Sequence, residues 1–308
     1  KEPIGAGDRR TLEAIREQVE QLPFHLRSTY GGNTTCVEVE TPDGLFILDS
    51  GSGLRELGRS LQHRWNDPAF TGKREAEVLI THPHMDHSYA TPFFASYYDP
   101  QNSFRIWGSE SVVESLNALL KPESEMSNVY FPPTFDLMQA IKELKPIHAG
   151  EEMVFGSTRI SAMELNHPGG CFAFRFECQD RSFVFATDHE QLKVPDPSLV
   201  AFSKEADLLY TEGQYTQAEY DGEEPVGDAT MSRKGWGHTP VEACVKSAVA
   251  AGVKRLHLGH YDPARTDEEI ARIERLFQEQ LRSLVEPLQP GYGMAEVLIP
   301  YEGMTVEL

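Results

Sequence analysis

The sequence predicts an α/β fold, because segments with the residue spacing of strands alternate with segments with the spacing of helices. The chain has 308 residues, of which 40% are hydrophobic, and this is enough to bury a large core. Several short aliphatic runs end in Gly, Asp or His, as buried strands do. No low-complexity linker divides the sequence, so we expect a single domain over residues 28–308, preceded by a helix and linker over residues 1–27.

The first half of the chain begins with a helical segment and then changes to strands. Residues 11–22 place apolar residues at helical spacing behind Thr11, a candidate N-cap. A Pro-Asp-Gly segment at 42–44 favours a turn between two strands, and Ser109 is a candidate N-cap for a later helix. In order, we expect strands over 36–39 and 45–48, a helix over 54–63, strands over 75–81 and 103–108, and a helix over 109–120.

The second half of the chain continues the alternation. Pro240 stands in the first turn of one predicted helix, where its fixed backbone angle is favourable. The last predicted helix opens with Asp and Glu residues, which stabilise a helix N-terminus. In order, we expect a helix near 136–144, strands near 153–165, 171–178, 182–187 and 206–212, a helix over 239–253, a strand over 255–260 and a helix over 266–285.

The charge and the cysteines exclude several classes of protein. Acidic residues outnumber basic residues by 48 to 28, so the net charge of −20 disfavours tight binding of long nucleic acid. Four cysteines lack C-x-x-C spacing and are interpreted as reduced thiols. The first residues have no apolar secretory core, and no run approaches the ~20 apolar residues of a membrane span. We therefore expect a cytoplasmic protein without a membrane partner.

A cluster of histidines follows the strand predicted at 75–81. The segment HPHMDH contains His82, His84, Asp86 and His87. Two histidines that follow the end of one strand can direct both rings at the same ion, and the acid and the third histidine can face a neighbouring point. Imidazole and carboxylate are ligands that zinc and similar ions accept. The alternative is a surface turn that holds several histidines by chance.

Three further candidate ligands stand at the ends of other predicted strands. They are His167, Asp188 and His260. Open α/β sheets place their sites at such junctions between strand and loop. Taken singly, each residue is more often a capping or surface residue, but together with the first cluster they supply seven ligands for two ions.

These motifs resemble those of the metallo-β-lactamase superfamily, in the order of that family, and the resemblance covers roughly residues 28–265. The upstream segments YGGNTTCVEVE and FILDSGSGLRELG also match. The resemblance implies an αββα sandwich, in which two mixed sheets face each other, helices lie outside and metals bind at one edge. It also implies three ligand roles: His82, His84 and His167 hold one metal, Asp86, His87 and His260 hold the other, and Asp188 bridges them. We expect two zinc ions, although the same ligands accept manganese or iron.

Two more segments resemble the phosphodiesterase branch that contains ribonuclease Z. DLLYTEGQYT matches a strand that ends in a functional Glu, here Glu212, and GWGHTPVEACVKSAVAAGV matches a loop with a functional His, here His238. In that branch the His contacts the scissile phosphate and the Glu orients it. The alternative for His238 is a loop or capping histidine. Enzymes of the ribonuclease Z type carry a tRNA-binding arm between the positions of His167 and Asp188, and the short segment here has no room for one.

The resemblance predicts a metal-dependent phosphodiesterase that cleaves a small phosphodiester or a cyclic nucleotide. A hydroxide shared by the two metals would attack phosphorus, while His238, held by Glu212, stabilises the phosphoryl oxygens or protonates the leaving group. Asp86 would steer the proton of the nucleophile. The alternatives are a lactonase or thioesterase and a non-catalytic nucleotide sensor. A homodimer is common in the branch.

Some other residues are weaker candidates for contact with a substrate. Aromatic residues are dense at 89–98 and 130–135, and a nucleobase could stack on some of them, although core or dimer contacts are the commoner use. Ser52, Arg233 and Lys234 could contact the substrate, or could be solvated loop residues.

Overall fold

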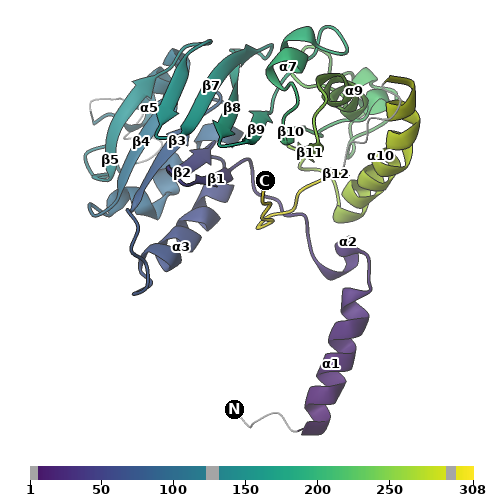
Figure 1. Cartoon of the computed structure of the whole chain (residues 1–308), viewed down its shortest axis with the longest axis horizontal. Helices are drawn as coiled ribbons and strands as arrows, with labels where there is room; N and C mark the ends of the chain where they lie inside the picture. The colour runs from purple at the N-terminus through teal and green to yellow at the C-terminus, as the bar shows by residue number, and fades with distance from the viewer. Residues whose placement is uncertain (1–5, 123–131, 289–295) are drawn as a thin grey trace.

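Two β-sheets form the centre of the molecule in the computed structural model, which describes residues 6–122, 132–288 and 296–308 (Figure 1). The first sheet has the strand order β1-β2-β3-β4-β5, and the second has the order β12-β11-β10-β9-β8-β7-β6. The strands of the first sheet are β1 (Val37–Thr41), β2 (Gly44–Leu48), β3 (Glu75–Leu79), β4 (Ser103–Gly108) and β5 (Ile141–Pro146). Those of the second are β6 (Glu152–Phe155), β7 (Thr158–Leu165), β8 (Cys171–Cys178), β9 (Arg181–Ala186), β10 (Leu208–Glu212), β11 (Arg255–Gly259) and β12 (Glu296–Leu298).

Both sheets are mixed. In the first, β1 pairs with β2 in antiparallel fashion, and β2 to β5 run parallel. In the second, β6 to β9 are antiparallel neighbours, and β9 to β12 run parallel. The carboxyl ends of the parallel strands therefore meet at one edge of each sheet, where loops can bring distant residues together.

Helices connect the strands and cover the outer faces of the sheets. Ser109 caps α5 by accepting a hydrogen bond from the Val112 amide, as its residue type predicts. Thr216 and Glu219 form a capping box at α8. The helices are α1 (Ala6–Glu20), α2 (Phe24–Arg27), α3 (Gly53–Trp65), α4 (Met85–Ser88), α5 (Glu110–Leu120), α7 (Pro197–Phe202), α8 (Gln217–Asp221), α9 (Val241–Ala251) and α10 (Asp267–Leu288), with short 3₁₀ turns η1 (Thr91–Phe93) and η2 (Ala95–Tyr98).

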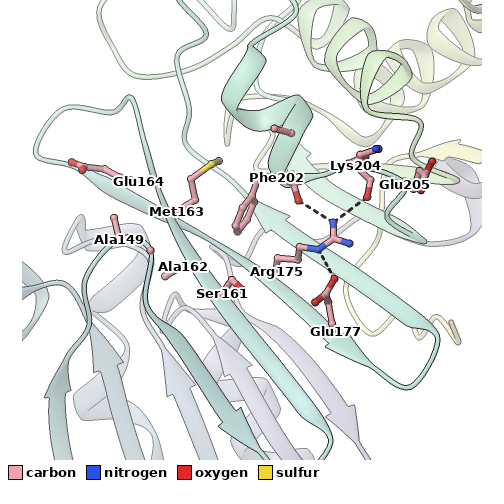
Figure 2. Close-up of a pocket in the computed structure, with 12 residues that line it drawn as sticks. Ala149, Ser161, Ala162, Met163, Glu164, Arg175, Glu177, Phe202, Lys204 and Glu205 are labelled. Carbon is pink, nitrogen blue, oxygen red and sulfur yellow. Dashed lines mark hydrogen bonds and ion pairs between the residues drawn. The ribbon is translucent and has the colours of Figure 1, made fainter.

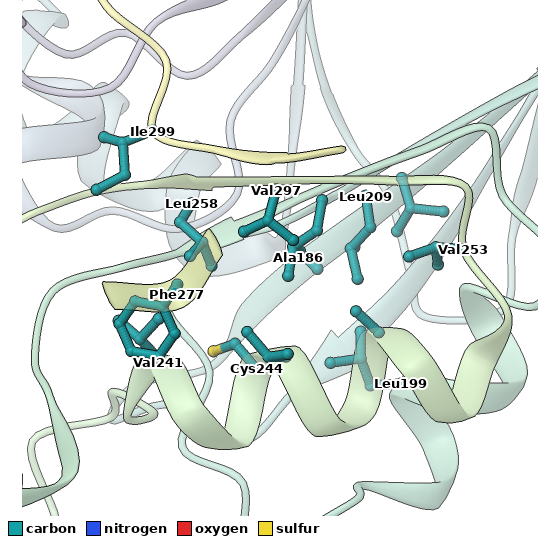
Figure 3. Close-up of a cluster of buried hydrophobic side chains, with 14 of the residues drawn as sticks. Ala186, Leu199, Leu209, Val241, Cys244, Val253, Leu258, Phe277, Val297 and Ile299 are labelled. Atoms are coloured by element: carbon teal, nitrogen blue, oxygen red, sulfur yellow. The ribbon is translucent and has the colours of Figure 1, made fainter. Parts of the chain in front are cut away.

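The packing of alternate residues separates three apolar layers. Phe46 and Leu48 of β2 pack with Phe174 of β8 between the two sheets, whereas Ile47 faces the layer under α3 and α5. The opposite outer face is covered by α9 and α10. Figure 3 shows Val241 and Cys244 of α9 lying against the strands of the second sheet. The order helix, sheet, sheet, helix confirms the predicted αββα sandwich.

The N-terminal helix α1 extends away from the two sheets (Figure 1). The side chains of residues 11–22 are exposed. The chain first packs on the core through Phe24, whose ring contacts Tyr30 at a centroid distance of 4.8 Å. Tyr30 is buried, and its hydroxyl donates to Glu274 of α10 at 2.8 Å. Among the helices in the described ranges, none combines the length and the apolar character that crossing a bilayer requires.

The structure corrects the prediction of a helix near 136–144. Residues 141–146 instead form β5, which pairs with β4 in parallel fashion. The apolar residues of this segment fit the spacing of a helix or of a strand. The edge of β4 supplies backbone hydrogen-bond partners, and these favour the strand. The single strand predicted near 153–165 is two strands joined by a turn at Gly156, which has a φ of +58°. The sequence did not predict β12, α7 or α8.

A pocket lies between β7, β8 and α7 (Figure 2). Its central cation, Arg175, donates to the carbonyl oxygen atoms of Phe202 and Lys204 at 2.9 Å and 3.2 Å and to Glu177 at 3.1 Å. Its lining contains none of the residues that the sequence predicts for the site. The Nε and Nη1 donors of Arg175 are therefore used within the protein.

Candidate metal centre

The predicted ligands follow the carboxyl ends of strands in both sheets. His82 and His84 follow β3, His167 follows β7, and Asp188 follows β9. The register places Thr211 opposite Ala186 and Glu212 opposite Gly259, so β9, β10 and β11 end at the same level. The residues that follow these ends, Asp188 and His260, therefore meet although they are far apart in the sequence.

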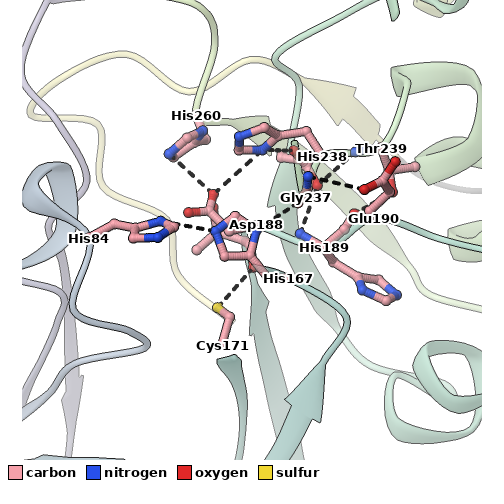
Figure 4. Close-up of polar contacts among 12 residues, drawn as sticks. His84, His167, Cys171, Asp188, His189, Glu190, Gly237, His238, Thr239 and His260 are labelled. Carbon is pink, nitrogen blue, oxygen red and sulfur yellow. Dashed lines mark hydrogen bonds and ion pairs between the residues drawn. The ribbon is translucent and has the colours of Figure 1, made fainter. Parts of the chain in front are cut away.

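His82, His84 and His167 form one group of converging side chains. His167 Nε2 lies 3.1 Å from His84 Nδ1 (Figure 4). The ring centroids of His82 lie 4.5 Å and 4.7 Å from those of His84 and His167. The possible ligand atoms of the three side chains all lie within 4.8 Å of one another, which is close enough to surround one ion.

A second group consists of Asp86, His87, Asp188 and His260. His87 Nε2 lies 3.0 Å from His260 Nε2 and 2.8 Å from Asp188 Oδ2. His260 Nε2 lies 3.1 Å from both Asp86 Oδ2 and Asp188 Oδ1. Asp188 and His260 have φ angles of +53° and +52°, a region that residues other than glycine rarely adopt. Strained backbone of this kind is concentrated at functional sites.

Asp188 connects the two groups. One of its oxygen atoms, Oδ2, lies 3.3 Å from His82 Nε2 and 2.8 Å from His87 Nε2. The carboxylate is 1% exposed, and neighbouring imidazoles hold its pKa well below the usual range even though burial raises it. A buried, ionised carboxylate therefore lies between two sets of imidazoles.

Asp49 is a buried carboxylate that the sequence analysis did not identify. It accepts hydrogen bonds from side chains next to the cluster. His87 Nδ1 donates to Asp49 Oδ2 at 2.8 Å, and the Thr81 hydroxyl donates to Asp49 Oδ1 at 2.9 Å. Because the Thr81 hydroxyl has given its only proton to Asp49, it accepts from His82 Nδ1 at 3.0 Å. Because these bonds use the Nδ1 atoms, the Nε2 atoms of His82 and His87 face the cluster and are the atoms that can bind a cation.

The same arrangement occurs at the third ring, where His167 Nδ1 donates to the Gly237 carbonyl at 2.8 Å. Burial lowers the pKa of His82 to about 2, so the ring is neutral, and its Nε2 atom has no hydrogen-bond partner among the described residues. Lone pairs and carboxylates that converge in a buried space repel each other unless a cation lies between them. Metal-binding histidines usually donate their other N–H group to a carboxylate or carbonyl, so this set of donors fits divalent cations.

His238 and Glu212 lie beside the second group. His238 Nδ1 is 2.8 Å from Glu212 Oε2 and 4.0 Å from Asp188 Oδ1. The ring of His238 stacks on that of His260 with a centroid distance of 5.4 Å. Burial lowers the pKa of His238, but Glu212 and Asp188 outweigh burial and raise it above its ordinary value. Glu212 is fully buried and also accepts from the amides of two loops that border the site.

Glu190 is a second supporting carboxylate that the sequence analysis missed. It accepts from the amides of Gly235 and Gly237 at 2.7 Å and 3.1 Å and from the Tyr220 hydroxyl. A Cβ atom on Gly237 would lie 2.1 Å from His167 Nδ1, so only glycine fits this close approach. Glu190 thus fixes the loop that supports His167 and carries His238. Its partners lie more than 25 residues away, so only its position two residues after Asp188 could have indicated this role.

Several of the weaker candidates for substrate contact have partners within the protein or lie in the core. The Ser52 hydroxyl accepts from the Thr34 amide, and Lys234 pairs with Asp221 at 2.7 Å. Phe94 and Tyr97 are buried in the core, while Tyr130 and Phe131 lie outside the described residues. Arg233 is buried, and its guanidinium bonds to backbone carbonyls.

Comparisons with known proteins agree with this geometry. The profile of the Beta-lactamase superfamily domain matches residues 46–261. Ribonuclease BN of Cronobacter sakazakii is 22% identical over 265 residues, which cover 73% of this chain and 83% of that protein. A ribonuclease of Thermus thermophilus is 29% identical over 153 residues, which cover 47% of this chain but only 33% of the Thermus protein.

Solved structures with low sequence identity share the fold. The metallo-β-lactamase fold protein YhfI of Bacillus subtilis aligns with a TM-score of 0.58 and 20% identity, over 91% of this chain and 96% of YhfI. Unliganded yeast PDE1 aligns with a TM-score of 0.55 and 14% identity, over 88% of this chain and 93% of PDE1. The profile match confirms the predicted family resemblance and, with it, the coarse class of metal-dependent hydrolase. It spans all of the predicted ligands, and the chain belongs to the beta-lactamase superfamily.

Proposed function

We propose that the chain is a dinuclear metal-dependent phosphodiesterase that hydrolyses a small phosphodiester. The observation that carries the proposal is the pairing of His238 with the buried Glu212, 2.8 Å apart, beside the carboxylate Asp188. A positively charged imidazole at this position can bind the anionic oxygens of a phosphodiester and can protonate a leaving alkoxide. The substrate of lactone or thioester hydrolysis is neutral and has no anionic oxygens for this imidazole to bind.

The ligand roles in this proposal follow the two groups of side chains. His82, His84 and His167 would hold one cation, Asp86, His87 and His260 would hold the other, and Asp188 lies beside ligand atoms of both groups. Two such cations lower the pKa of a water molecule and offset the negative charge that develops at phosphorus. We propose zinc, because imidazole and carboxylate are its usual ligands, although manganese and iron accept the same set.

The side chains divide the proton transfers between them. Glu212 accepts from His238 Nδ1, so the Nε2 atom of His238 is the one that is left to face the substrate. As the attacking oxygen forms its bond to phosphorus, the bond between phosphorus and the leaving oxygen breaks, and His238 donates a proton to that oxygen. Asp86 is 41% exposed at its side chain and is the carboxylate best placed to take the proton of the incoming water.

The short segment between His167 and Asp188 favours a small substrate over a transfer RNA. This segment consists of the hairpin β8–β9, and its strands are joined at Gln179, which adopts a φ of +53°. The hairpin belongs to the second sheet and carries no inserted arm. With a net charge of −20, this favours a small ester over a long RNA, even though several relatives are named ribonucleases.

A substrate panel tests the proposal. Zinc-loaded protein is assayed with bis-p-nitrophenyl phosphate, cyclic nucleotides, a lactone and a thioester. We expect turnover of phosphodiesters that falls at least 100-fold in His238→Ala, in line with the usual contribution of a positioned acid. His63→Ala, a change at an exposed histidine of α3, should retain full activity. Lactone or thioester turnover that survives His238→Ala, without phosphodiester turnover, would overturn the proposal in favour of a carbon-ester hydrolase.

Two broader expectations remain predictions. The four cysteines are free in the structure, in keeping with the reducing compartment expected from the sequence. A homodimer is expected from the resemblance alone. Cell fractionation and the hydrodynamic mass of the purified protein would check the two expectations.

A further inference from the structure

Trp236 is an exposed aromatic side chain on a loop whose backbone is firmly held. The residue is 46% exposed. The residues on either side, Gly235 and Gly237, donate their amides to the buried carboxylate of Glu190 at 2.7 Å and 3.1 Å. Both glycines have positive φ angles, +82° and +89°, which fix the turn around Trp236. The indole is therefore mounted on a backbone that has little freedom to move.

A buried cation lies against the indole. The guanidinium carbon of Arg233 is 4.9 Å from the ring centre of Trp236 and 5.5 Å from that of Tyr215. Arg233 is 4% exposed and forms no ion pair in the part of the chain that the structure describes. Its bonds go to the carbonyls of Met231 and Ala229. A cation against the ring orients the indole by attraction to its π-face.

These contacts continue from Trp236 to the candidate active site. Tyr215, which is 2% exposed, meets the ring of His238 edge to face with a centroid distance of 6.1 Å. Trp236 is also only two residues from His238 along the chain. The carbonyl of the intervening Gly237 holds His167, and Figure 4 shows Gly237 and His238 beside the ligand cluster. The same loop thus carries an exposed indole and supports two residues of the site.

We propose that Trp236 is a specificity-determining residue that stacks on a planar aromatic group of the substrate, such as a nucleobase. The proposal rests on the proposed phosphodiesterase function and deepens it by naming the substrate as a nucleotide-like ester. A large, rigid aromatic ring binds with little loss of conformational entropy, because the loop and Arg233 have already ordered it. Stacking is also tolerant of the identity of the base, since every base has a π-face.

Kinetic comparison of two cyclic phosphodiesters tests the proposal. Adenosine 2′,3′-cyclic phosphate carries a base, whereas glycerol 1,2-cyclic phosphate has a similar reacting ring without one. In Trp236→Ala we expect KM for the adenosine ester to rise about 5- to 100-fold, the range for loss of one stacked base. We expect little change in kcat and no change for the glycerol ester. Trp236→Phe should recover most of the loss, and Tyr301→Ala, at an aromatic residue with 41% exposure whose ring contacts Phe24, should leave both substrates unaffected.

A binding measurement separates this proposal from the proposed function. Calorimetry compares zinc-loaded protein with adenosine monophosphate and with ribose 5-phosphate. We expect tighter binding of the nucleotide in the native protein, and equal binding of the two ligands in Trp236→Ala. If no phosphodiester is hydrolysed but the preference for the base depends on Trp236, the proposed function fails and this inference stands. If phosphodiesters are hydrolysed and Trp236→Ala affects both esters equally or neither, the inference is overturned.

Discussion

Asp49 and Glu190 show how single buried carboxylates organise the centre without facing it. Asp49 fixes the protons on the rings of His87 and His82 through direct and Thr81-mediated bonds, whereas Glu190 fixes the loop that carries His238. Each satisfies several donors at once, so removal of its charge leaves buried N–H and O–H groups without an acceptor. The ligands alone therefore do not define the site, because their orientation depends on a surrounding set of acceptors.

The first prediction concerns Asp49→Asn. The amide preserves the size of the side chain but presents a donor to groups that already donate, so the rings of His82 and His87 lose their fixed orientation. We expect zinc affinity to fall about 10- to 100-fold, as is usual for the loss of such a partner. Competition with a chromophoric chelator measures this. Asp43→Asn removes an exposed carboxylate that accepts from Ser157 and serves as the matched control. Equal affinities for zinc in the two variants would contradict the role of Asp49.

The second prediction concerns Glu190→Gln. Three donors would compete for one carbonyl oxygen, so we expect a loss of about 1–3 kcal/mol in the free energy of unfolding. We also expect turnover to fall by more than metal content does, because the loop carries His238 and holds only one of the predicted ligands, His167. Chemical denaturation, turnover and metal content are measured together, with Glu177→Gln at a partly exposed surface ion pair as the control. A loss of one metal with normal turnover per remaining site would argue against a loop-positioning role.

At the scale of elements, the ends of strands explain why so much of the site could be predicted. His167, Asp188 and His260 are each preceded by an aliphatic run, and parallel strands bring such ends to one edge. The helix predicted near 136–144 was wrong because residues 141–146 are stabilised by pairing with β4, a partner that local spacing does not reveal. Trp236 was not identified from the sequence either. Its contact with Arg233, and the hydrogen bonds that hold its loop to Glu190, form only in the folded chain.

The third prediction concerns the N-terminal helix, which we propose to be separate from the domain over residues 28–308. Removal of residues 1–22 deletes only exposed side chains among those described, so we expect Tm and turnover to stay unchanged. Removal of residues 1–30 also deletes Phe24 and the buried Tyr30, which contacts Asp267 and Glu274, and should lower Tm clearly. Thermal unfolding of the two truncated chains checks this. A large loss of stability in the shorter truncation would show that α1 is part of the domain.

At the scale of the whole molecule, a net charge of −20 is combined with a local site for cations. The two divalent ions that we propose would bring four positive charges, against two negative ones from Asp86 and Asp188, so the centre would attract a phosphate even though the acidic protein repels it overall. The composition alone predicted that the protein repels phosphate, because the net charge depends only on residue counts. The layers of the fold were predicted through the family resemblance, whereas the exact pairing of strands required the folded chain.

The fourth prediction follows from this charge. We expect a labelled RNA of transfer-RNA size to bind more weakly than about 10⁻⁴ M at 0.15 M salt, the weak end of non-specific binding by nucleic-acid-binding proteins. Fluorescence anisotropy measures the affinity at two salt concentrations. Saturable binding that strengthens steeply as the salt is lowered would reveal a basic RNA-binding surface and contradict the preference for a small ester.

The central claim is that two cations share Asp188, and an anomalous difference map from crystals of the zinc-loaded protein tests it most directly. Data collected on either side of the zinc absorption edge identify zinc specifically, because its anomalous signal changes across the edge. We expect two peaks about 3.5–4 Å apart, the usual separation in two-metal sites. One should lie among His82, His84 and His167, and the other among Asp86, His87 and His260, with Asp188 between them. A single peak, or two peaks that Asp188 does not join, would show that two cations do not share Asp188.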